Sequence, residues 1–66
     1  MSTFLERLKN ERNELREKHE KLNSFIMTNP AFNDLDDIQS ILLKAQYHAM
    51  TTYLFILNQR LIELNK

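Results

Sequence analysis

The sequence contains no glycine and a single proline, Pro30, in 66 residues. Glycine and proline are the residues that most readily interrupt a helix, so this chain can form long helices with one break. Pro30 disfavours helical geometry at Asn29, which places the break there. The sequence therefore predicts an all-α fold, an antiparallel helical hairpin with helices at about 3–28 and 34–65. Residues 1–66 are expected to form a single domain.

Two polar patterns mark the expected helix starts. Thr3 and Glu6 have the spacing of a capping box, which places the start of the first helix near Thr3. Asn33 or Asp34 is expected to cap the second helix, which would begin near Leu35. Two further aspartates would then lie in its first turn, where the helix dipole favours negative charge.

The second half of the chain is apolar on more than one side of its expected helix. The first helix has one heptad stripe with two seam positions. One position holds Leu8, Leu15 and Leu22, and the other holds Leu5, Arg12, His19 and Ile26. The second helix has a main seam and two further apolar runs. Its seam holds Leu43, Tyr47, Met50, Leu54, Leu57, Leu61 and Leu64, and the other runs hold Leu35, Ile38, Leu42, Ala45, Ala49, Tyr53 and Ile56, and Ile41, His48, Phe55 and Ile62.

A helix that is apolar all round has to be buried all round, and one partner helix cannot do this. A chain of this length is also marginally stable alone and usually needs a disulfide, a metal or oligomerisation. There is no cysteine, and the two histidines, His19 and His48, do not make a structural metal site. We therefore expect copies of the chain to pack together through the second helix in a homo-oligomeric helical bundle.

The composition argues against several classes of function. Lys and Arg total nine and Asp and Glu total nine, whereas proteins that bind long nucleic acids are usually basic. No apolar run approaches the length of a membrane span, and no signal-peptide pattern is present, so a soluble cytoplasmic protein with no membrane partner is expected. No phosphate loop, zinc-protease motif or di-iron motif occurs. We expect no enzyme activity, no catalytic residue, no cofactor and no metal.

The basic residues Lys9, Arg12 and Arg16 share one face of the first helix. Lys9 and Arg16 have acidic neighbours one turn away, as do the other basic residues of this helix. Arg12 has none, although it occupies a seam position. Its partner could be a carboxylate of another chain or a phosphate, whose oxygens match the guanidinium fork. Alternatively, Arg12 extends from the edge of the seam to water.

Several aromatic and polar residues are secondary candidates. Phe4 near Lys9 offers a flat surface for a nucleobase, or forms a hydrophobic staple. His19 is expected to be satisfied by an interchain hydrogen bond. Gln46 either sets the register of the assembly or lines a polar pocket on a symmetry axis. The candidates for a second site, or for lining such an axis, are Gln46, His48 and Tyr53.

The sequence resembles a known group of proteins over about residues 4–62. The resemblance rests on "FLERLKNERNELREKHEKLNSFI", on the Phe and Leu of "AFNDL", and on "LLKAQYHAMTTYLFILNQRL". Gln46 with Met50, and Glu14 with Leu15, are part of the shared pattern. The group consists of very short all-helical phage proteins that include the anti-CBASS sponges, which sequester cyclic oligonucleotide messengers of bacterial antiphage immunity.

The resemblance implies a compact homohexamer that binds cyclic dinucleotides such as cGAMP between protomers, without cleaving them, in the cytoplasm of the infected host. The lysine that contacts the phosphates falls on Lys9, and Arg12 with outer support from Arg16 would add positive charge. The related proteins carry a base-stacking tyrosine upstream of this lysine. No tyrosine precedes Lys9 here, and Phe4 is the candidate substitute. Their arginine for cyclic trinucleotides corresponds to Leu54, which counts against trinucleotide binding.

Two other functions remain open on the sequence alone. The apolar stripes suit a small helical oligomer that binds another protein as an interaction module. The basic stripe of the first helix suits an RNA-binding helical bundle, although the balanced net charge argues against it.

Overall fold

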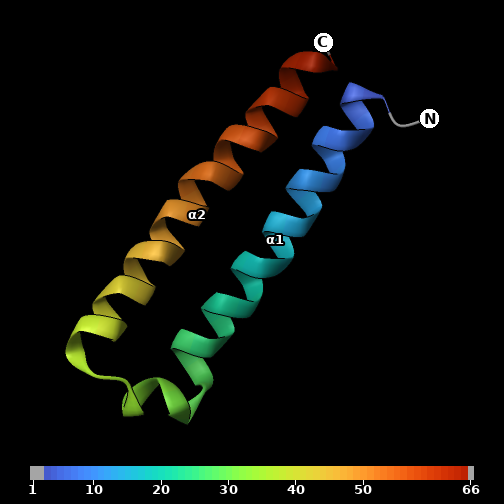
Figure 1. Ribbon diagram of the computed structural model, residues 1–66. Coiled ribbons are helices and arrows are strands. Elements are labelled where there is room, and N and C mark those ends of the chain that lie inside the picture. Colours follow the sequence, from blue (N-terminus) through green and yellow to red (C-terminus); the bar gives the residue numbers. More distant parts are fainter. Residues whose placement is uncertain (1–2, 66) are drawn as a thin grey trace.

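The computed structural model describes residues 3–65 and shows two long helices joined by a short 3-10 helix (Figure 1). Helix α1 spans Phe4–Thr28, the 3-10 helix η1 spans Pro30–Asp34, and helix α2 spans Asp37–Leu64. The start of α1 and the end of α2 lie at the same end of an antiparallel hairpin (Figure 1). The predicted all-α hairpin is confirmed.

Helix α1 begins and ends where its local sequence predicts. The Glu6 amide donates to Thr3 Oγ1 at 3.0 Å, and the Glu6 carboxylate accepts from the Thr3 amide at 3.4 Å, which completes the capping box. Asn29 ends the helix in an extended conformation, as expected for a residue that precedes proline. Its side-chain oxygen then accepts from the Ala31 amide at 2.9 Å and caps η1.

The expected start of the second helix is wrong by about two residues. Asn33 and Asp34 belong to η1, and Leu35 closes that element by donating its amide to the carbonyl of Phe32 at 3.2 Å. Asp36 is the cap of α2, with its carboxylate accepting from the Gln39 amide at 2.7 Å. The single turn that follows proline therefore displaces the cap by two to three residues along the chain.

The buried core is small and lies near the open end of the hairpin. Leu8, Leu57 and Leu61 are 3%, 0% and 6% exposed, with Leu5 and Leu15 packed against them. A fully buried leucine contributes roughly 1.5–3 kcal/mol, so three of them support only a modest stability. Elsewhere the contact between the helices is half-buried, and it contains Leu22, Phe25, Ile26, Leu43, Tyr47, Met50 and Leu54.

Helix α1 covers only one side of α2, so most of the remaining apolar surface of α2 is exposed. Leu64, which the seam pattern places in the core, is 49% exposed. The outer face, defined here as the exposed apolar residues Ile38, Ile41, Leu42, Phe55, Ile56 and Ile62, runs along most of the helix. This distribution fits the prediction that copies of the chain pack together, which stays a prediction. Within residues 3–65, no helix is long and apolar enough to cross a bilayer.

His19 has a partner within its own chain, contrary to the expected interchain hydrogen bond. Its Nε2 lies 2.7 Å from Thr51 Oγ1, and its ring stacks on Tyr47 with centroids 4.5 Å apart. The Thr51 hydroxyl also contacts the Tyr47 carbonyl at 3.0 Å. This cluster ties the middle of α1 to the middle of α2 and fixes the register of the hairpin.

Candidate functional site

Lys9 and Arg12 line one shallow groove between the end of α2 and the beginning of α1. The groove contains two cations, two side-chain amides and two apolar residues: Lys9, Arg12, Asn58, Leu61, Ile62 and Asn65. No carboxylate is among these lining residues of the described chain, so nothing within the groove neutralises its two positive charges. The arrangement favours an anion that also has an apolar surface.

Lys9 is exposed and lacks the ion pair that its sequence neighbours suggested. The acidic neighbour of Lys9 one turn away is Glu6, whose carboxylate takes part in the capping box with Thr3. Lys9 makes no hydrogen bond or ion pair with any residue in the described range 3–65. Its ammonium group is therefore free to bind an anion at the groove.

Arg12 is half-buried and is held by two neutral side chains. Its Nη1 donates to Asn58 Oδ1 at 3.0 Å, and its Nε donates to Asn13 Oδ1 at 2.8 Å. The expected alternatives were a carboxylate or phosphate from elsewhere, or extension into water. The amides satisfy part of the guanidinium without cancelling its charge, so three of its five N–H donors remain.

Arg16 and Phe4 do not line the groove of Lys9 and Arg12 within one protomer. Arg16 lies one turn beyond Arg12, is exposed, and has no hydrogen bond or ion pair with the residues that the structure describes. Phe4 lies on the opposite flank of the hairpin, with the guanidinium of Arg60 5.9 Å from its ring centre. Phe4 could therefore stack on a nucleotide beside Lys9 only as a contribution from another protomer.

The three candidates for a second site are exposed but do not form one cluster. Tyr53 donates its hydroxyl to the Glu11 carboxylate, which links α2 to α1. His48 lies edge-on to Tyr47 at 5.5 Å. Gln46 lines a different hollow near the connecting segment, together with Leu22 and five other residues. Any shared site for Gln46, His48 and Tyr53 would thus need more than one copy of the chain.

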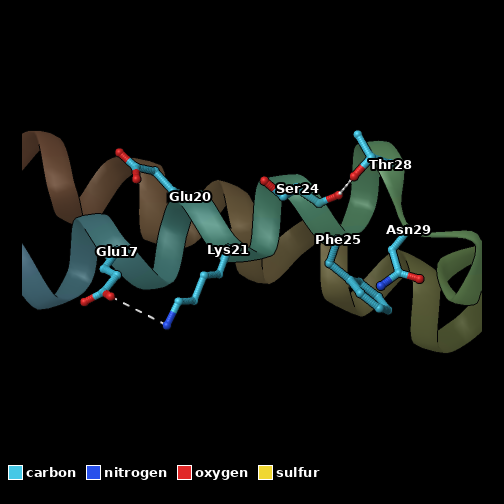
Figure 2. A pocket seen from close by; sticks show the side chains of 7 residues that line it. All are labelled: Glu17, Glu20, Lys21, Ser24, Phe25, Thr28 and Asn29. Atoms are coloured by element: carbon cyan, nitrogen blue, oxygen red, sulfur yellow. Dashed lines mark hydrogen bonds and ion pairs between the residues drawn. The ribbon is translucent and has the colours of Figure 1, made fainter.

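Two other surface hollows have a chemistry less suited to a nucleotide phosphate. The hollow in Figure 2 lies along the second half of α1 and contains Glu17 and Glu20, with Lys21 paired to Glu17 at 3.6 Å. Two carboxylates against one paired lysine disfavour an anion. Another hollow is lined by Phe4 of α1 together with Phe55 and other residues of α2, and this hollow is mainly apolar.

Sequence reasoning missed the amides that complete the groove. Asn58 interrupts the run of leucines at 54, 57 and 61, which was a signal for a polar role at the seam. The register of the antiparallel hairpin sets Asn58 opposite Arg12. Arg12 contacts Asn58, and His19, seven residues further along α1, contacts Thr51, which lies seven residues before Asn58 on α2. Nothing in the sequence singles out Asn65, which caps the C-terminal end of α2, as a residue of the groove.

Comparison with known proteins identifies the family of the chain. No curated protein and no solved structure matches it significantly. The model of one family, described as Sequestin, matches residues 2–63, which is nearly the whole chain. The name of the family indicates a sequestering function. The chain therefore belongs to the Sequestin family.

Proposed function

We propose that this protein is a phage-encoded sponge that sequesters a small anionic nucleotide messenger, with cyclic dinucleotides as the first candidates. By holding the messenger without cleaving it, the sponge would block CBASS-type immunity in the cytoplasm of the infected bacterium. The observation that carries the proposal is the groove with two uncompensated cations, Lys9 and Arg12. The family name and the resemblance to the anti-CBASS sponges also support it.

The groove chemistry suits a phosphate diester beside a nucleobase. The guanidinium of Arg12 keeps three N–H donors for phosphate oxygens, and Lys9 adds a mobile point charge next to it. Leu61 and Ile62 give the groove an apolar wall against which a base or a sugar can pack. The Asn65 amide can both donate to and accept from a base edge.

A complete site needs more than one protomer. A cyclic dinucleotide carries two phosphates related by an approximate two-fold axis, and a site shared by two chains would present Lys9 and Arg12 twice. Ile62 lies in the groove and is 53% exposed, so a second copy would bury it there. The outer face of α2 provides further area for the larger assembly, a homohexamer in our proposal.

Sequestration requires tight stoichiometric binding and no turnover. A sponge lowers the free messenger concentration in proportion to the number of its sites, so the proposed role is that of a binding protein and not of an enzyme. This predicts that the nucleotide recovered from the complex has the same mass and chromatographic mobility as the nucleotide added.

A thermal-shift panel tests the proposal. Ligand at about one hundred times its Kd adds about 2.7 kcal/mol of stability per site. A site shared by two protomers gives each of them about half of this, which corresponds to a rise of at least about 5 °C in the melting temperature of a small domain. The panel should hold cyclic dinucleotides, cyclic trinucleotides, and nucleotides whose two phosphates are joined as a pyrophosphate. A response confined to the pyrophosphate-linked nucleotides would support the sequestering function but would show that cyclic dinucleotides are not its ligand. No response to any member would refute the proposal.

The exposed outer face of α2 favours a second candidate, a module that binds another protein. In that case a pull-down recovers one specific partner, and nucleotides neither compete with it nor raise the melting temperature. An RNA-binding bundle would instead show affinity for RNA that falls steeply with added salt.

A further inference from the structure

The contact between Arg12 and Asn58 suggests how the proposed site keeps its charge. Asn58 lies on α2 and accepts from Arg12 Nη1 at 3.0 Å, across the boundary between the two helices. Asn13, the next residue on α1, accepts from Arg12 Nε at 2.8 Å. We propose that Asn58 is a positioning residue, which orients the Arg12 guanidinium in the groove for phosphate. This inference rests on the proposed nucleotide-binding function.

The amide of Asn58 can hold Arg12 in place without neutralising its charge, which a carboxylate at the same position could not do. A carboxylate would accept the same hydrogen bond but would also form an ion pair that cancels the charge of Arg12. The amide oxygen of Asn58 accepts one hydrogen bond and adds no net charge. Arg12 is thereby held in place while its positive charge stays available to a ligand.

The position of Asn58 makes the orientation effective. Arg12 and Asn58 are both half-buried, so their hydrogen bond is partly protected from water. Two hydrogen bonds at different nitrogen atoms fix the plane of the guanidinium, which reduces the freedom that phosphate binding would otherwise remove.

Four variants test this role: Asn58→Ala, Asn58→Asp, Arg12→Gln, and the double variant Arg12→Gln with Asn58→Ala. Asn23→Asp is the matched control, because it adds the same charge at an exposed site of α1, about 16 Å along the helix from Arg12. The measurements are the Kd for the nucleotide that gives the largest thermal shift, by titration calorimetry, and the melting temperature without ligand.

We expect Asn58→Ala to raise the Kd about threefold to tenfold, the effect of releasing one ordered side chain. Asn58→Asp should raise it more than tenfold without lowering the melting temperature, because the carboxylate pairs with Arg12 and repels phosphate. In the Arg12→Gln background, Asn58→Ala should have almost no further effect, as is expected of a residue that acts through Arg12. Asn23→Asp should leave the Kd unchanged.

Two results would overturn the inference while leaving the proposed function intact. One is a wild-type Kd in both Asn58 variants, and the other is an equal loss from Asn58→Ala with and without Arg12. If Asn58→Ala fails to fold, Asn58→Asp replaces it in the comparison with and without Arg12→Gln, and an equal loss of affinity in the two backgrounds would overturn the inference. A wild-type protein that binds no nucleotide would refute both the proposed function and the role of Asn58.

Discussion

Replacing Lys9 by alanine separates ligand binding from folding. Lys9 is exposed and makes no hydrogen bond or ion pair within residues 3–65, so its removal takes no polar contact from the fold that the structure describes. The expected change in the free energy of unfolding is within about 0.5 kcal/mol. The helix should be unaffected, since alanine is the best helix former.

The effect on binding should be much larger than the effect on stability. A hydrogen bond to a charged partner is worth about 1.5–3 kcal/mol, which corresponds to roughly a tenfold to hundredfold increase in Kd. A site shared by two protomers loses two such contacts per ligand, about 3–6 kcal/mol in all, so the expected increase in Kd is at least about a hundredfold.

The assay is titration calorimetry with the nucleotide, together with thermal melts of the free protein. The control is Lys21→Ala, which removes the same charge from α1 at a residue paired with Glu17 in the hollow of Figure 2. That exposed ion pair contributes at most about 1 kcal/mol, so the control should fold and bind normally. If Lys9→Ala bound the nucleotide as tightly as Lys21→Ala does, Lys9 would not belong to the site.

Three further predictions concern the fold and the assembly. Leu57→Ala should lower the free energy of unfolding by about 2–5 kcal/mol, because Leu57 is 0% exposed; a loss below 1 kcal/mol in urea titrations would contradict its central place in the core. Thr3→Ala should cost about 1 kcal/mol and speed hydrogen exchange in the first turn of α1, whereas unchanged exchange would show that the capping box is unimportant. Ile56→Glu should shift the mass in light scattering toward the 8.0 kDa protomer, and an unchanged oligomer would exclude this part of the outer face from the interface.

The sequence predicts the hairpin because its signals are local and strong. The heptad positions identify the leucines that meet between the helices, and the capping box of Thr3 and Glu6 fixes the first helix start. The start of α2 could not be predicted as well, since two aspartates and an asparagine all precede it. Only the turn after Pro30, which takes up Asn33 and Asp34, leaves Asp36 as the cap.

The candidate site could be predicted only in part. Helical spacing places Lys9 and Arg12 on one face, and the structure brings them into one groove. The position of Asn58 beside Arg12 depends on the register of the hairpin. That register is set by contacts between residues far apart in the sequence, so the sequence alone did not place Asn58 in the site. Phe4 is near Lys9 along the chain, yet the helical turn carries it to the opposite flank, where it contacts Arg60.

An NMR titration with the nucleotide that gives the largest thermal shift tests the central claim most directly, because it reports both whether the ligand binds and where. The account predicts saturable shifts of the Arg12 Nε–H signal and of the Asn58 and Asn65 side-chain amides, which line the groove. It also predicts small shifts for the residues of the hollow in Figure 2. Shifts centred on that hollow, or no shift at saturating ligand, would contradict the account.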